Sequence, residues 1–136
     1  MRRIPVHGSM DWERMLEACD GVVRVVEVRL PDGVCGLYDE TSGLVLVDSG
    51  MRDWQKRCAL VHELVHWSYG DRGCSPGVVC REEARARREA ACLLVDEAAY
   101  ASAEASTGGK VFPMACELDV TVQVVLDFQR VLASRR

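Results

Sequence analysis

The stretch "RCALVHELVHW", residues 57–67, places two histidines and a glutamate inside an apolar run. Residues four apart on an α-helix lie on one face, with their Cβ atoms about 5–6 Å apart. His62 and His66 can therefore reach one zinc ion, which binds imidazole nitrogens at about 2.0–2.1 Å. Glu63 is turned from His62 by about 100° around the helix, so it can act as a general base on water instead of binding the metal. The spacing predicts a metal site with His62 and His66 as ligands and Glu63 as the catalytic base.

The alternative interpretation is a core helix that carries two histidines by chance. The chain has only three histidines, however, and two of them flank a glutamate with the required spacing. Buried imidazoles without a metal or another partner would also leave unpaired nitrogens, which costs free energy. Both observations favour the metal site. The third histidine, His7, lies in a Gly-Ser segment and is expected at the surface.

A catalytic zinc ion needs a third protein ligand and one open position for water. The helix predicted over residues 81–106 offers Glu82, Glu83, Glu89 and Glu97 as candidate ligands. Glu83 shares a face with Ala86 and Ala90, whose small side chains would let two helices approach closely. Glu82 and Glu89 fall on the polar face, and Glu97 lies about 21 Å along the helix from Glu83. We predict Glu83 as the third ligand, with Glu82 as the next candidate.

Cysteine ligands are a further possibility, because thiolates bind zinc well. Cys74 and Cys80 flank the loop between the two predicted helices. Together with the histidines they would form a four-ligand structural site with no position for water. The simpler interpretation gives these two thiols no role and places Cys58 and Cys92 in the core.

The hydrophobic patterns predict an α+β fold with a small antiparallel sheet of about three strands. The strands are expected at residues 22–30, 34–40 and 44–50. The sheet should pack with an amphipathic helix at 52–69, the ligand-bearing helix at 81–106 and a last helix that begins after Thr121. A short first helix is expected between Ser9, as its N-cap, and Gly21. The last helix should bury Val124, Val125, Phe128, Val131 and Leu132 and expose Gln123, Asp127 and Arg130.

Composition limits the classes of function. The 136 residues indicate one domain with a core at about 22–132, and the net charge of −4 lacks the basic footprint of a nucleic-acid binder. No apolar run is long enough for a membrane span, and no secretion signal is recognisable at the N-terminus. We therefore expect a cytoplasmic protein with no membrane or direct nucleic-acid partner. The arginines at 85, 87 and 88 are expected to be solvated, with a groove for an acidic partner as the alternative.

Two segments resemble the ImmA/IrrE family of metallo-endopeptidases. The segment "ALVHELVH", residues 59–66, is similar to the family pattern (T/A)LAHELGH. The second family pattern, ExEANxFAAxLL, is matched in register by Glu83, Ala86, Ala90, Ala91, Leu93 and Leu94. The resemblance covers roughly residues 22–132. The proline that usually follows the Leu-Leu pair is absent, so we expect the helix to continue through "LLVDEAAY".

The resemblance implies a stand-alone hydrolase domain with one zinc ion held by His62, His66 and Glu83. Such metalloproteases are typically encoded by phages, mobile elements or stress loci, and some cleave helix-turn-helix repressors. The expected activity is therefore cleavage of a peptide bond in a regulatory protein, in the host cytoplasm if the protein is phage-encoded. The alternative is a non-catalytic, zinc-containing module that binds and antagonises a repressor or a toxin. Glu63 favours the enzyme, because a purely structural zinc site has no use for it.

Overall fold

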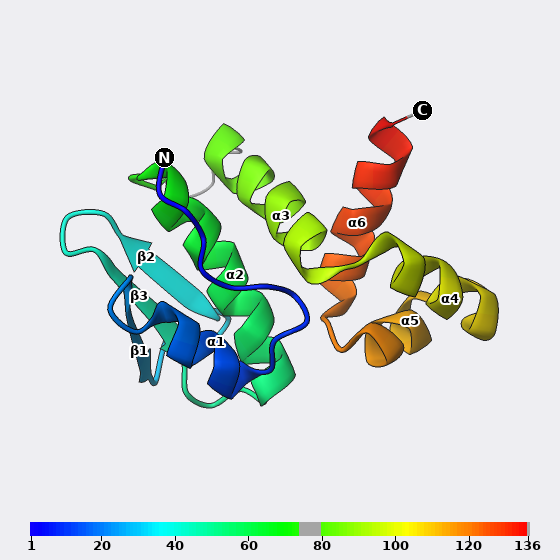
Figure 1. Cartoon of the computed structure of the whole chain (residues 1–136), viewed down its shortest axis with the longest axis horizontal. Helices are drawn as coiled ribbons and strands as arrows, with labels where there is room; N and C mark the ends of the chain where they lie inside the picture. The colour runs from blue at the N-terminus through cyan, green and yellow to red at the C-terminus, as the bar shows by residue number, and fades with distance from the viewer. Residues whose placement is uncertain (74–79, 136) are drawn as a thin grey trace.

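Three strands and six helices make up the fold in a computed structural model that describes residues 1–73 and 80–135 (Figure 1). In chain order they are α1 (Trp12–Cys19), β1 (Arg24–Val28), β2 (Gly36–Asp39), β3 (Leu44–Asp48), α2 (Asp53–Tyr69), α3 (Arg81–Leu94), α4 (Glu97–Thr107), α5 (Val111–Leu118) and α6 (Val122–Ser134). The α+β class expected from the sequence is confirmed. Across the described ranges, no helix has the length and apolarity that crossing a bilayer requires.

The sheet is mixed, with the strand order β1-β3-β2. β2 and β3 form the expected antiparallel hairpin, but β1 runs parallel to β3, with Arg24 opposite Leu44. The prediction of a purely antiparallel sheet was therefore wrong. β3 carries Val45 and Val47, both fully buried, and the middle of the sheet is where a strand loses most solvent contact. After β1 the chain therefore forms β2 at the opposite edge of the sheet, and β3 then occupies the centre between them.

α2 is the central helix of the molecule. It lies between the sheet and α3, and α1 packs on it as well (Figure 1). From Arg57 to Ser68 every residue except His62 is buried, so α2 is enclosed on nearly all sides and is not the amphipathic helix that we expected. The helix ends at Gly70, whose positive φ of 65° closes its last turn.

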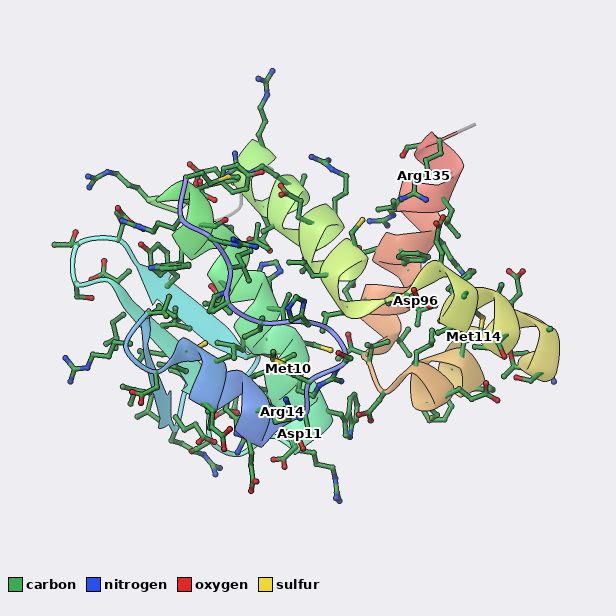
Figure 2. All side chains as sticks on the ribbon, in the orientation of Figure 1. Met10, Asp11, Arg14, Asp96, Met114 and Arg135 are labelled. Atoms are coloured by element: carbon green, nitrogen blue, oxygen red, sulfur yellow. The ribbon has the colours of Figure 1, made fainter. Side chains whose placement is uncertain are left out.

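The helix predicted over residues 81–106 is two helices. α3 ends at Leu94, Val95 and Asp96 are extended, and α4 then leaves in a new direction (Figure 1). Figure 2 shows Asp96 at this junction, where its carboxylate accepts a hydrogen bond of 3.0 Å from the backbone N–H of Ala99. The break lets Tyr100 turn inward against Phe128, with ring centroids 5.1 Å apart. The prediction that one helix continues through residues 95–106 was wrong, because the contact of Tyr100 with Phe128 requires the chain to change direction.

The N-terminal segment is held against the rest of the fold by hydrogen bonds. Asp11, not the predicted Ser9, caps α1 and accepts from the backbone N–H of Arg14 at 2.9 Å (Figure 2). The buried guanidinium of Arg57 donates to the carbonyls of Gly8 and Met10. It also donates to the carbonyl of Asp119 at 2.8 Å, which lies between α5 and α6. One side chain of α2 therefore fixes two segments that are far apart in the sequence.

α6 buries its predicted apolar stripe in the core, with one exception among the residues expected in solvent. Thr121 caps the helix by accepting from the backbone N–H of Val124 at 3.2 Å. Val124, Val125, Phe128 and Val131 are buried, and Leu132 is half-buried. Asp127, expected in solvent, is only 6% exposed and accepts a hydrogen bond from Gln123. α5, which precedes α6, was not predicted, although the apolar run that begins at Val111 is a recognisable signal.

Candidate metal centre

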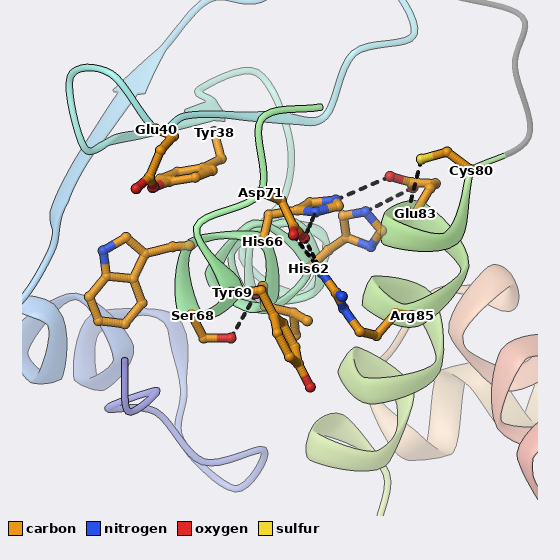
Figure 3. A network of polar contacts seen from close by, with 12 residues as sticks. Tyr38, Glu40, His62, His66, Ser68, Tyr69, Asp71, Cys80, Glu83 and Arg85 are labelled. Carbon is orange, nitrogen blue, oxygen red and sulfur yellow. Dashed lines mark hydrogen bonds and ion pairs between the residues drawn. The ribbon is translucent and has the colours of Figure 1, made fainter. Parts of the chain in front are cut away.

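Three side chains from two helices meet between α2 and α3 (Figure 3). His62 and His66 project from one face of α2, and Glu83 lies in the first turn of α3. One carboxylate oxygen of Glu83 lies 2.9 Å from Nε2 of His62, and the other lies 3.1 Å from Nε2 of His66. The Sγ atom of Cys80 caps α3 by accepting from the backbone N–H of Glu83 at 3.4 Å. The helix start therefore fixes the backbone from which Glu83 reaches the histidines.

The geometry of these three residues fits a small cation. Their ligand atoms all lie within 4.8 Å of one another. Tetrahedral ligands about 2.0–2.2 Å from one zinc ion are about 3.4 Å apart, so only small side-chain adjustments separate the present distances from a coordination shell. Two imidazoles and one carboxylate are also a ligand set typical of catalytic zinc, which keeps one position open. The residues predicted from the sequence are thus brought together by the fold.

Glu63 lines a cavity next to this cluster. The cavity has a volume of about 420 Å³, and its lining includes Glu63, His62 and Glu83. Gly36 on β2 lies directly against Glu63, because a Cβ atom at residue 36 would be 2.9 Å from Cγ of the glutamate. A side chain at residue 36 would displace the carboxylate. β2 therefore helps to determine where the predicted base stands.

Burial and neighbouring charges alter the acidity of the site in opposite directions. Burial raises the pKa of Glu63, although the nearby histidines oppose the shift. Hydrogen bonds to His62 and His66 hold the pKa of Glu83 well below its usual range. Burial alone would lower the pKa of His66, but its hydrogen bonds to Glu83 and Asp71 outweigh this effect and raise the pKa to about 9. Without a metal ion, a proton on His66 therefore balances part of the negative charge of the carboxylates.

A second set of contacts, which the sequence did not reveal, holds the other ring nitrogen of His66, Nδ1. Nδ1 of His66 lies 2.9 Å from a carboxylate oxygen of Asp71, which is 7% exposed. The guanidinium of Arg85 donates to both oxygens of Asp71 and lies over the ring of Tyr69, 3.7 Å from its centroid (Figure 3). The Tyr69 hydroxyl in turn donates to Glu89. Because Asp71 contacts Nδ1, it leaves Nε2 of His66 facing the metal position.

The other residues considered from the sequence lie elsewhere. Glu82 is half-buried, and its Oε2 has no hydrogen-bond partner among residues 1–73 and 80–135. Glu97 belongs to α4 and pairs with Arg135, so it does not share a helix with Glu83 as predicted. His7 is exposed as expected.

The cysteines contribute no ligand atom to the cluster of His62, His66 and Glu83 within the described ranges. Cys58 is buried as predicted, whereas Cys92 is exposed, contrary to the prediction. The possible role of Cys74 lies outside the described residues.

No protein-family model, curated protein or solved structure matches this chain. The chemistry of the site is therefore inferred from its own residues.

Proposed function

We propose that this chain is a zinc-dependent endopeptidase that hydrolyses a peptide bond in a regulatory protein. The observation that carries the proposal is the meeting of His62, His66 and Glu83 beside a cavity that also contains Glu63. The resemblance of two segments to ImmA/IrrE metallo-endopeptidases supports the same activity. It also suggests a helix-turn-helix repressor of a phage or mobile element as the substrate.

In the proposed reaction, His62, His66 and Glu83 hold one zinc ion. The ion, when bound, supplies Lewis acidity that polarises the scissile carbonyl and makes a water easier to deprotonate. Glu63 accepts the proton from the attacking water and then donates it to the leaving amine. Burial suits Glu63 to both steps, because its raised pKa brings proton uptake closer to neutral pH.

The test compares bound metal and hydrolysis in matched glutamate-to-glutamine variants. Wild type should hold one zinc ion, measured by mass spectrometry of the metal in purified protein. Glu63→Gln should keep the ion and lose hydrolysis of an unfolded protein substrate by at least about a hundredfold, as expected for removal of a general base. Glu83→Gln should lose most of the metal. Glu82→Gln, one residue away, is the matched control and should keep both metal and activity.

Two outcomes would overturn the proposal. A wild-type protein that binds no divalent metal would remove the chemical basis of the site. A protein that binds zinc but hydrolyses no polypeptide with Glu63 intact would instead favour the non-catalytic module that antagonises a repressor or a toxin.

A further inference from the structure

A groove of about 550 Å³ lies between α3 and α6, beside the candidate metal centre. Its lining consists of Cys80, Glu83, Ala84, Arg87, Arg88, Asp127, Arg130, Val131 and Ser134. Glu83, Arg87 and Asp127 also line the cavity that contains Glu63. The two depressions therefore adjoin each other at these residues, so a chain placed at Glu63 has the groove between α3 and α6 next to it.

Positive charge predominates in this groove. Nε of Arg87 lies 3.6 Å from Glu83, and a guanidinium nitrogen of Arg130 lies 3.7 Å from Asp127. These separations are longer than a direct hydrogen bond, and both arginine side chains remain largely exposed, at 47% and 74%. Arg88 makes no ion pair with any residue in the described part of the chain. A dication bound by Glu83 would cancel its negative charge and leave Arg87 free for another anion.

Arg87 and Arg88 are exposed, as expected for a solvated helix face. Both also line a concave surface beside the metal ligands, which fits the alternative expectation of a groove for an acidic partner. A guanidinium in such a position can donate two parallel hydrogen bonds to a carboxylate. The rest of the molecule is acidic, with a net charge of −4 for the whole chain, so a polyanion such as a nucleic acid would be repelled outside the groove. The buried carboxylate of Asp127 inside the groove adds to that repulsion.

We propose that this groove binds acidic side chains of the substrate polypeptide on one side of the scissile bond. The substrate class is then a protein segment with glutamate or aspartate residues close to the bond that is cleaved. The catalytic use of the groove rests on the proposed endopeptidase activity, but binding of an acidic peptide does not require cleavage.

The test measures binding of two fluorescein-labelled, unstructured decapeptides that differ only at three central positions, occupied by glutamates or by glutamines. The protein carries Glu63→Gln, so that the peptides stay intact, and fluorescence anisotropy is recorded with and without added zinc. The glutamate peptide should bind at least about fivefold more tightly than the glutamine peptide at low salt, since each exposed ion pair contributes up to about fivefold. The preference should shrink at high salt, which screens exposed charges.

Two double variants of equal charge locate the binding site. Arg88→Gln with Arg130→Gln should abolish the preference for the glutamate peptide. Arg14→Gln with Arg24→Gln, exposed arginines on α1 and β1, should retain it. The proposal is overturned if the parent protein binds both peptides equally, or if the groove variant keeps the preference. It is also overturned if a thymidine octanucleotide binds the groove more tightly than the glutamate peptide, which would indicate a nucleic-acid site.

The protein with Glu63 intact separates this proposal from the proposed function. A glutamate preference that depends on the groove arginines, without hydrolysis of any peptide, would support the groove and contradict the endopeptidase. Hydrolysis of both peptides with equal kcat/KM would support the endopeptidase and contradict the groove.

Discussion

Asp71 lies in the turn after α2, where its carboxylate contacts Nδ1 of His66 and binds the guanidinium of Arg85. A carboxylate in this position fixes the orientation of the imidazole ring and makes its other nitrogen a better ligand. We expect Asp71→Ala to weaken zinc binding about 10–100-fold. The affinity is measured by competition with a chelator of known strength.

The control for Asp71 is Glu89→Gln, which changes a carboxylate at the outer end of the same set of contacts and leaves Asp71 and His66 in place. Its zinc affinity should equal that of the wild type. Unchanged zinc affinity in Asp71→Ala, together with a lower unfolding temperature of the metal-free protein, would mean that Asp71 serves only the fold.

Gly36 on β2 limits the position of Glu63, the predicted base, from the side of the sheet. A Cβ atom there would lie 2.9 Å from Cγ of Glu63 and 3.3 Å from its Oε2. Gly36→Ala should therefore keep zinc but lower kcat/KM at least about tenfold, because a displaced carboxylate loses part of the contribution of a general base. Gly50→Ala is the matched control, since its new Cβ atom would meet only the ends of the Arg29 and Asp48 side chains, none of them closer than 3.3 Å. Full activity in Gly36→Ala would show that Glu63 tolerates displacement.

The sequence was informative about this site where spacing along one helix determines geometry. The four-residue separation of His62 and His66 was sufficient to place them together, and the helical phase of Glu83 predicted which carboxylate would join them. Asp71 and Arg85 could not be found in this way, because their contact joins a turn to another helix. Only the packing of α3 against α2 defines that distance.

At the scale of elements, the break between α3 and α4 depends on a helix cap. The carboxylate of Asp96 accepts from the backbone N–H of Ala99, which would otherwise be unpaired at the start of α4. Asp96→Ala should lower the free energy of unfolding by about 1 kcal/mol, as measured by urea denaturation, whereas Asp96→Asn should cost much less. Equal urea midpoints for wild type and Asp96→Ala would show that packing of Tyr100 alone maintains the break.

This break also shows which element boundaries a sequence can predict. Asp96, with Glu97 and Ala99 after it, is a recognisable helix start, but the uninterrupted run of helix-forming residues masked it. The pairing of the strands was only partly predictable from the sequence. The hairpin of β2 and β3 follows from local turn residues, whereas the parallel pairing of β1 with β3 results from competition among strands for the buried centre.

For the whole molecule, pH should control the stability of the metal-free protein through the candidate site. His66 has a pKa raised from 6.5 to about 9 in the folded state. A group with a raised pKa stabilises the fold fully below its unfolded value and loses that effect as pH rises through the folded value. Glu83 has a lowered pKa, so its carboxylate stabilises the fold at neutral pH, and this stabilisation is lost as the pH falls through the acidic range.

We therefore expect the urea midpoint of chelator-treated protein to fall as pH rises from about 6.5 to about 9. Zinc affinity should rise over the same interval, because the metal competes with a proton for His66. Asp71→Asn, which removes the carboxylate whose hydrogen bond raises the pKa of His66, should shift both changes to lower pH. A urea midpoint that is constant over this interval would contradict the proposed protonation of His66.

The central place of β3 has a consequence for the order in which the molecule opens. Residues 44–48 pair on both sides, and the buried Val45 and Val47 anchor the strand, whereas β1 and β2 each pair on one side only within the described part of the chain. Backbone amides exchange with deuterium only when their hydrogen bonds open. The amides of β3 should therefore be among the last in the sheet to exchange, while those on the outer edge of β2, beside Glu63, exchange early. The wall of the candidate site that β2 provides would then open without unfolding of the core.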